Sequence, residues 1–326
     1  VGPYVRALCA INQRIVYSRN PDYWGADLNV NVGRHNYDSI RIEYFGDAIA
    51  AMEGFKAGVY TLRPENSSKS WATAYEFDAV ARGDVIKDEI PDGNVPAANG
   101  FVMNLLRPVF QDIRVREAVQ LAFNFEWTNE SLQYGLFRHR SSFWQDSALE
   151  AKGLPEGREK EVLEALGDQT DPTILTTEPV MAHASKPGRP SDRRNLRRAM
   201  KLLDEAGWAV GDDGVRRNAA GEVMQIEFLL DSPTLERIVQ PYVANLITMG
   251  IDAKLNRVDF AQYTSRRREK DFDMVSFAYP KSLEPSTGLY QQFGSEAHQY
   301  SVFTPAGTAD PAMAELIANI VKPTTA

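Results

Sequence analysis

Apolar residues recur along most of the chain with the spacing of strands or of amphipathic helices, and Gly, Pro and Asp mark the changes between them. Residues 101–106 alternate as a short strand, and Pro108, which cannot donate a ladder hydrogen bond, ends it. Asp112 then follows as a helix N-cap. The next apolar residues have helical spacing, at Val115, Ala118, Val119 and Ala122. This stretch therefore predicts a strand, a turn and a helix with one buried face.

The first hundred residues predict a βαβ unit. Alternation indicates strands at 14–18 and 38–45, Asp47 caps a helix through Ala57, and residues 59–62 are expected to form the next strand. Two strands joined by a helix should be parallel, and ligands gather beyond the carboxyl ends of such strands. The segment after Leu62 is therefore a candidate ligand site. A further strand is expected at 85–90, and the Gly, Pro and Asn of 91–98 favour a domain boundary.

The last hundred and thirty residues predict a second alternating series. Expected strands and helices follow one another at 225–230 (strand), 235–249 (helix), 251–258 (strand), 260–268 (helix) and 272–277 (strand). Before this series, Ser191 is expected to cap a helix that ends at Gly207 and carries four arginines. This alternation of strands and helices predicts a second α/β layer structure.

Composition excludes several classes of protein. The 326 residues are 43% hydrophobic and 25% charged, and no apolar run approaches the ~18 residues that a membrane helix needs. A net charge of -8 argues against a protein that binds nucleic-acid backbones, so the arginines near residue 195 are expected to form a solvated helix face. Cys9 is the single cysteine, which leaves no internal disulfide and no cysteine-rich metal site.

No catalytic or metal-binding pattern stands out in the sequence. The four histidines are scattered, and there is neither a Gly-x-Ser-x-Gly elbow nor a phosphate-binding loop. With 44 acidic residues, a pair of neighbouring carboxylates carries no information. We therefore expect no enzyme activity, no cofactor and no metal.

Several short motifs together resemble the peptide/nickel class of extracellular solute-binding proteins, family 5, and its YejA-like branch. They occur in family order, as NPDYWG at 20–25, FQDIRVREA at 110–118, FNFEWTN at 123–129, AGW at 206–208, MGID at 249–252 and DFD at 271–273. The matches cover nearly the whole chain, and no single motif is decisive.

The resemblance implies an α/β fold of two lobes, the periplasmic-binding-protein-like fold of type II, cluster C, with mixed sheets flanked by helices. Residues 1–98 would be part of the first lobe and 99–326 the second lobe, with the hinge crossing near 99–108, around Asn104. Family members begin before Val1 and continue past Ala326. The first lobe is therefore expected to be incomplete, with exposed sheet edges and apolar surface.

Two segments are the candidate ligand contacts, in addition to Asn104 at the hinge. Glu65, Asn66 and Trp71 follow the predicted strand 59–62, where they form either a cleft wall or an ordinary surface loop. Tyr279, Lys281 and Ser282 follow the last predicted strand, in a segment that is otherwise a charged hairpin tip.

The second segment departs from the pattern of the family's peptide binders, where an aromatic residue and then an aspartate receive the ligand's amino group. Here Tyr279 and Lys281 fall near those places. A lysine would repel an ammonium and favour a carboxylate, a phosphate or sugar hydroxyls, whereas Glu284 could take the amine if the loop is shifted.

The resemblance predicts a monomeric periplasmic substrate-binding protein of an ABC importer. It would hold a peptide or another small-molecule ligand by hinge closure and deliver it to permease subunits in the inner membrane. The alternatives are an oligosaccharide- or opine-binding protein of the same class and, less expected, an extracytoplasmic hydrolase on the same scaffold.

Overall fold

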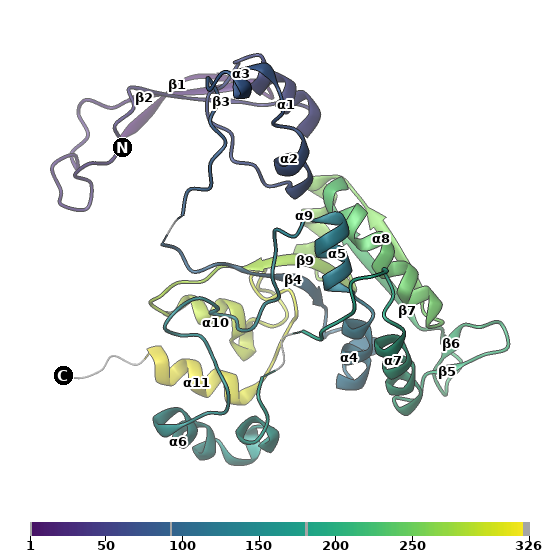
Figure 1. Ribbon diagram of the computed structural model, residues 1–326. Coiled ribbons are helices and arrows are strands. Elements are labelled where there is room, and N and C mark those ends of the chain that lie inside the picture. Colours follow the sequence, from purple (N-terminus) through teal and green to yellow (C-terminus); the bar gives the residue numbers. More distant parts are fainter. Residues whose placement is uncertain (1, 92, 180–181, 322–326) are drawn as a thin grey trace. The chain divides into compact units, whose positions relative to one another are not determined.

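The chain divides into two compact units, Val1–Glu89 and Ile90–Ala326. The computed structural model in Figure 1 describes residues 2–91, 93–179 and 182–321. The two units are contiguous in sequence, so the backbone crosses from one to the other once within this chain. The crossing falls next to the segment 91–98 in which the sequence predicts a boundary. The assignment of the two units to the lobes of a clamshell stays a prediction.

The first unit is built on a three-stranded antiparallel sheet in the order β1-β2-β3. Its strands are β1 (Tyr4–Ala10), β2 (Arg14–Arg19) and β3 (Ser39–Glu43). The predictions for β2 and β3 are confirmed, whereas β1 was not predicted. Apolar residues of the outer strands remain between 37% and 48% exposed, at Val5, Leu8, Ile40 and Ile42. This sheet therefore keeps apolar surface in contact with solvent.

Three short helices follow the sheet, namely α1 (Ala48–Lys56), α2 (Ser68–Thr73) and α3 (Asp78–Ala81). The predicted cap of α1 is confirmed, because an Asp47 carboxylate oxygen accepts a hydrogen bond from the Ala50 backbone N–H at 2.7 Å. Past the end of this helix, Gly58 has a φ of +72°, a left-handed conformation that glycine adopts without strain.

The predicted βαβ unit is wrong. Neither 59–62 nor 85–90 is a strand in this part of the described chain, and β3 pairs antiparallel with β2. Leu62 is 78% exposed, and the Tyr60 hydroxyl turns back to donate to the Ala51 carbonyl at 2.7 Å. The apolar residues of 59–62 thus have no sheet to join, and Tyr60 contacts α1 instead.

The second unit is built on a mixed four-stranded sheet in the order β4-β9-β7-β8. Its strands are β4 (Ala98–Met103), β7 (Gln225–Leu230), β8 (Asp252–Arg257) and β9 (Met274–Tyr279). The strand β7 runs parallel to β8 and β9, and β4 runs antiparallel to β9. The connections between the parallel strands contain α8 (Pro233–Thr248) and α9 (Phe260–Arg268). The predicted second α/β series is confirmed.

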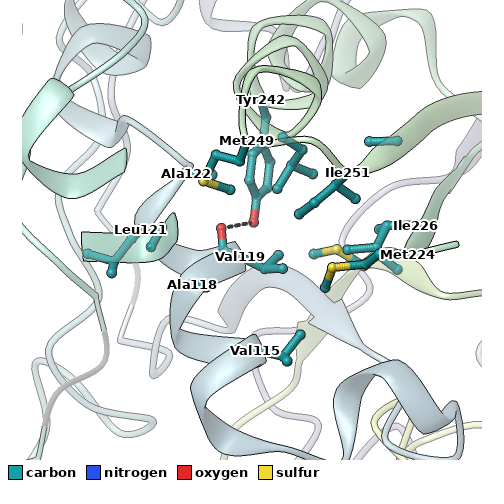
Figure 2. Packing of buried hydrophobic residues seen from close by; sticks show 14 of the residues in the cluster. Val115, Ala118, Val119, Leu121, Ala122, Met224, Ile226, Tyr242, Met249 and Ile251 are labelled. Carbon is teal, nitrogen blue, oxygen red and sulfur yellow. Dashed lines mark hydrogen bonds between the residues drawn. The ribbon is translucent and has the colours of Figure 1, made fainter. Parts of the chain in front are cut away.

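The two faces of this sheet are covered by different helices. Along β7, the alternate residues Ile226 and Phe228 face the main core, together with α4 (Ile113–Leu121), α7 (Arg193–Glu205) and α8. Leu229, which points to the opposite face of the strand, packs with Tyr263 of α9. Figure 2 shows the main core, where the buried Tyr242 hydroxyl donates to the Val119 carbonyl at 2.9 Å. This bond ties α8 to α4.

N-cap residues in the sequence predicted where α4 and α7 of this core begin, to within one residue. Asp112 caps α4 as predicted, with its carboxylate accepting from the Arg114 N–H at 2.8 Å. The cap of α7 is Asp192 and not Ser191, because the Asp192 carboxylate accepts from two backbone N–H groups. The exposed side chains of this helix include the arginines at 193, 194, 197 and 198, as a solvated face requires.

The remaining elements of the second unit lie outside the central sheet. They are α5 (Phe125–Leu132), α6 (Gly157–Ala165), α10 (Gly288–Phe293), α11 (Pro311–Val321), the two-stranded sheet of β5 (Ala209–Val210) and β6 (Arg216–Arg217), and four 3₁₀ helices (Pro108–Phe110, Gly167–Gln169, Pro172–Leu175, Ser295–Ala297). A small cluster of Leu163, Leu166 and Ala312 joins α6 to α11. Across the described ranges, no helix is both long and apolar enough to cross a bilayer.

Candidate functional site

The carboxyl end of β9 carries the most unusual side-chain environment of the second unit. The strand reaches Tyr279, two residues beyond the predicted end, so Tyr279 is its last residue and is only 7% exposed. Its ring stacks on Phe293 of α10 with centroids 5.7 Å apart, and the edge of Phe143 meets it at 5.6 Å. Burial raises the pKa of Tyr279 to about 12. The tyrosine therefore forms a neutral aromatic wall.

Lys281 extends into this aromatic cluster. Its ammonium nitrogen lies 4.5 to 5.3 Å from the centroids of four rings, those of Phe143, Trp144, Tyr279 and Phe293. Each ring presents the negative part of its quadrupole to a cation placed over its face. We call these four rings and Lys281 the lysine box. The box joins residues that lie up to 150 positions apart in the sequence, Phe143 and Phe293.

Charge is poorly compensated in the lysine box. The closest polar partner of the ammonium is the Gln292 side-chain oxygen at 3.4 Å. No carboxylate of the described residues pairs with Lys281 within 4 Å. Burial, with a smaller contribution from the positive charge of Arg140, lowers the pKa of Lys281 to about 8. The ammonium of Lys281 is therefore partly desolvated, and aromatic rings take the place that a carboxylate counter-ion would otherwise have.

A cavity of about 220 Å³ lies beside the lysine box. Its lining includes Trp144, Lys281, Ser282, Glu284 and Gln292. The Trp144 indole N–H donates to the Ser282 carbonyl at 2.9 Å, which fixes the loop after β9 against the segment around 144. The cavity thus combines an aromatic plate, a cation, a carboxylate and a side-chain amide, a mixture typical of small-molecule sites.

A second cavity, of about 480 Å³, lies between α6 and α11 but offers less chemistry. No aromatic side chain lines it, and two of its charged groups, Arg158 and Glu161, pair with each other at 3.0 Å. The described residues contain no cluster of three or more His, Cys, Asp or Glu side chains that could hold a metal ion.

The structure brings three of the predicted contacts together, Tyr279, Lys281 and Ser282. Sequence reasoning missed Phe143, Trp144, Phe293 and Gln292, which complete the site. The aromatic pair at 143–144 was visible in the sequence, but nothing local connected it to Lys281. That these side chains contact a ligand stays a prediction.

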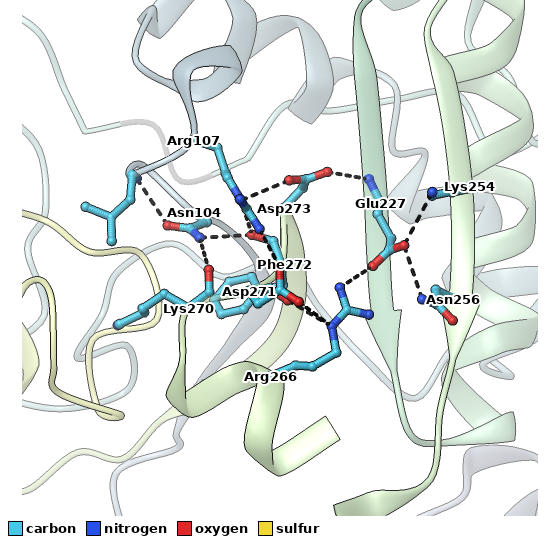
Figure 3. A network of polar contacts seen from close by, with 11 residues as sticks. Asn104, Arg107, Glu227, Lys254, Asn256, Arg266, Lys270, Asp271, Phe272 and Asp273 are labelled. Carbon is cyan, nitrogen blue, oxygen red and sulfur yellow. Dashed lines mark hydrogen bonds and ion pairs between the residues drawn. The ribbon is translucent and has the colours of Figure 1, made fainter. Parts of the chain in front are cut away.

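Asn104 lies elsewhere, in a buried polar network at the carboxyl end of β4 (Figure 3). It is 0% exposed, its amide donates to the carbonyls of Lys270 and Phe272 at 3.0 and 2.9 Å, and its oxygen accepts from the Leu106 N–H at 3.1 Å. All of these bonds are internal to the second unit. The geometry gives Asn104 a structural task, and its predicted ligand contact stays a prediction.

The same network contains charged side chains that fix the start of β9. Arg107 pairs with Asp271 and Asp273 at 3.0 and 3.2 Å. Burial would raise the pKa of Asp271, but hydrogen bonds from Arg266 and Arg107 outweigh it and lower this pKa. For Asp273, burial dominates and raises the pKa. Figure 3 also shows Arg266 between Asp271 and Glu227, so the network extends across to β7.

The other three predicted contacts belong to the first unit. Both carboxylate oxygens of Glu65 are occupied, one by the Ser67 N–H at 2.9 Å and the other by Arg63 and the Tyr75 hydroxyl at 3.2 and 3.0 Å. Trp71 is half-buried beneath the ammonium of Lys87, which lies 4.4 Å from a ring centroid. Asn66 is exposed. Glu65 and Trp71 therefore have internal partners, and their role toward a ligand stays a prediction.

Comparison with known proteins identifies the family of this chain. Residues 1–301 match the profile of the bacterial extracellular solute-binding proteins, family 5, described as its middle region. The chain belongs to this family.

Three relatives illustrate the similarity. A probable peptide-binding protein, YejA, from Agrobacterium fabrum is 38% identical over 323 residues, which are 98% of this chain and 52% of that protein. The oligopeptide-binding protein AppA from Bacillus subtilis, solved with a nonapeptide, has a TM-score of 0.68 at 18% identity, over 98% of this chain and 54% of that one. A periplasmic oligopeptide-binding protein from Thermotoga maritima, solved with mannohexaose, has a TM-score of 0.66 at 17% identity, over 97% and 54%.

These comparisons confirm the predicted family and fold class. The chain spans about half the length of the curated relatives it matches. The family and its structural neighbours are binding proteins.

Proposed function

We propose that this chain provides much of a periplasmic solute-binding protein that feeds an ABC importer, and that its solute is a peptide or a peptide-like compound. The observation that carries the proposal is family membership at 38% identity to a probable peptide-binding protein. The cavity beside the lysine box supplies a site of suitable chemistry. The permease subunits of the inner membrane would be its protein partners.

The proposed mechanism is hinge closure by a monomer. Two compact units joined by one crossing of this chain are suited to it, because a solute that contacts both units binds the closed state more tightly than the open state. Binding then raises the population of the closed state, which is the state that the permease would recognise. The solute is released without chemical change.

An oligosaccharide is the second candidate ligand. Two observations favour it: the Thermotoga maritima neighbour was solved with mannohexaose, and Trp144 presents a ring beside the cavity on which a sugar face could stack.

Isothermal titration calorimetry of the whole protein distinguishes the two candidates. We expect oligopeptides of three to nine residues to bind with a negative heat-capacity change, because closure buries apolar surface. Mannohexaose is the matched neutral ligand. Saturable binding of mannohexaose with none for any oligopeptide would replace the peptide assignment by the sugar one, and binding of neither would remove both.

A further inference from the structure

The ammonium of Lys281 forms no ion pair with any carboxylate of the described residues. Four rings surround it at 4.5 to 5.3 Å, and Gln292 offers one carbonyl oxygen at 3.4 Å. Aromatic rings attract a cation but accept no strong hydrogen bond, so at least two of its three N–H donors lack a strong acceptor in the described protein. Lys281 is half-buried, and a partly desolvated charge in this condition gains more from a new anionic partner than a fully exposed one does.

The cavity gives such a partner a place to bind. At about 220 Å³ it has the volume of about seven water molecules at about 30 Å³ each, enough for a carboxylate with a small side chain attached. The loop that closes the cavity contains Pro280 and Pro285 and is tied to Trp144 through the Ser282 carbonyl. Little order has to be created when a ligand group enters, because the wall is already formed.

Three other titratable or charged groups lie near Lys281, and together they determine the sign of the electrostatic potential in the cavity. Arg140 adds positive charge, and its guanidinium is held by the Ala97 carbonyl at 2.7 Å. Tyr279 is neutral at physiological pH, as tyrosines are, and burial raises its pKa further, to about 12. Glu284 lines the cavity and is exposed, and it forms no ion pair with Lys281. Two cations thus face one solvated carboxylate.

We propose that Lys281, held in its box of four rings, is a specificity-determining subsite that pairs with a carboxylate of the bound solute and excludes a free ammonium from the cavity. The proposal deepens the solute-binding function above and rests on it. The rings hold the lysine chain in place and leave its charge available, so that the pairing costs little side-chain entropy.

The test uses two small probes that differ in charge. N-acetyl-alanine carries a carboxylate and no ammonium, and alanine amide carries an ammonium and no carboxylate. Each is titrated into the full chain by NMR, reading the ε-methylene signal of Lys281, which the ring currents of four aromatic neighbours separate from other lysines, and the indole N–H signal of Trp144. We expect N-acetyl-alanine to shift both signals and to raise the pKa of Lys281 above about 8, and alanine amide to shift neither.

Two variants assign the effect. Lys281→Met keeps an unbranched chain in the box and removes the charge, and it should weaken N-acetyl-alanine binding by about tenfold to a hundredfold, read at Trp144. Glu284→Gln removes the competing carboxylate and should strengthen the same binding. Binding of alanine amide that is lost in Glu284→Gln would overturn the proposal, because Glu284 would then be an ammonium anchor. Equal binding of N-acetyl-alanine to wild type and Lys281→Met would overturn it as well.

Failure of this subsite differs from failure of the proposed function. If oligopeptides bind the whole protein equally well with Lys281→Met, the subsite is wrong and the function stands. If N-acetyl-alanine pairs with Lys281 but no oligopeptide binds, the subsite stands and the peptide function is wrong.

Discussion

Replacement of Asn104 by alanine tests whether this buried side chain has a structural role in the second unit. The Asn104 side chain makes three hydrogen bonds of 2.9 to 3.1 Å from a position with no solvent exposure. Two of them connect the end of β4 to the turn between α9 and β9, and the third fixes the turn after β4 itself. If the residue is a structural link, its loss lowers the stability of the second unit and leaves ligand affinity nearly unchanged.

The magnitude follows from the partners that lose their hydrogen bonds. The Phe272 carbonyl keeps a donor, because the Arg107 Nε–H reaches it at 3.0 Å. The Lys270 carbonyl loses its Asn104 donor, and a buried acceptor without a donor costs about 1–3 kcal/mol. The Leu106 N–H lies on a residue that is 38% exposed, so water replaces the bond and the loss is about 0.5–1 kcal/mol. The free energy of unfolding should therefore fall by about 1.5–4 kcal/mol.

The assay measures the free energy of unfolding from the dependence of hydrogen exchange on urea concentration. The amides of β9 are read out, because they report on the second unit alone. Gln262→Ala is the matched control, because it removes an exposed amide side chain from α9 and should change the free energy by less than about 0.5 kcal/mol. A change below about 0.5 kcal/mol for Asn104→Ala, combined with a large loss of ligand affinity, would refute the structural role and restore the predicted ligand contact.

Three further predictions concern the second unit. Tyr242→Phe removes the buried bond to the Val119 carbonyl and should lower the free energy of unfolding by about 1 kcal/mol in urea titrations, since that carbonyl keeps the Ala122 N–H. Arg216→Met leaves the carbonyls of Met249 and Trp208 without a donor and should lower the free energy of unfolding by about 3–5 kcal/mol. Asp204→Asn, at the exposed ion-pair partner of Arg216, should lower it by less than about 1 kcal/mol. Equal decreases for the two variants would contradict this prediction. Burial lowers the pKa of Lys270 to about 8, so the unfolded chain binds more protons above that pH, and the free energy of unfolding should rise between pH about 8 and about 10.4. Lys281, whose pKa is also lowered to about 8, should add a rise of the same sign, so Lys270→Met should reduce the rise and the double variant with Lys281→Met should reduce it further. An unreduced rise in thermal unfolding of Lys270→Met would assign it to other groups.

Local signals determined most of the second unit. Asp112 and Gly207 mark helix ends through bonds to their own neighbours, and the expected strand 225–230 alternates because one face meets α8 and the other α9. The sequence misled at 59–62, where four residues have strand-like composition but no neighbouring strand with which to pair. Pairing is a tertiary property, and a short apolar run does not reveal it.

Only part of the candidate site could be predicted from the sequence, because tertiary contacts are not visible in a short segment. Lys281 and Ser282 follow a strand end, a place where ligands are expected from topology. Phe143, Trp144 and Phe293 arrive from distant segments and are brought to Lys281 by the packing of α10 and the 140–147 loop against β9. Asn104 shows the converse, since its predicted place at the hinge suggested a ligand contact and its three internal bonds indicate a structural role.

Native mass spectrometry of the whole protein, after exposure to a mixed pool of oligopeptides and oligosaccharides, shows which solute it retains and whether that solute is altered. We expect one bound peptide per chain, retained at its original mass and released unchanged on unfolding. Retention of sugars alone, no retained solute, or the appearance of cleaved peptides would contradict it.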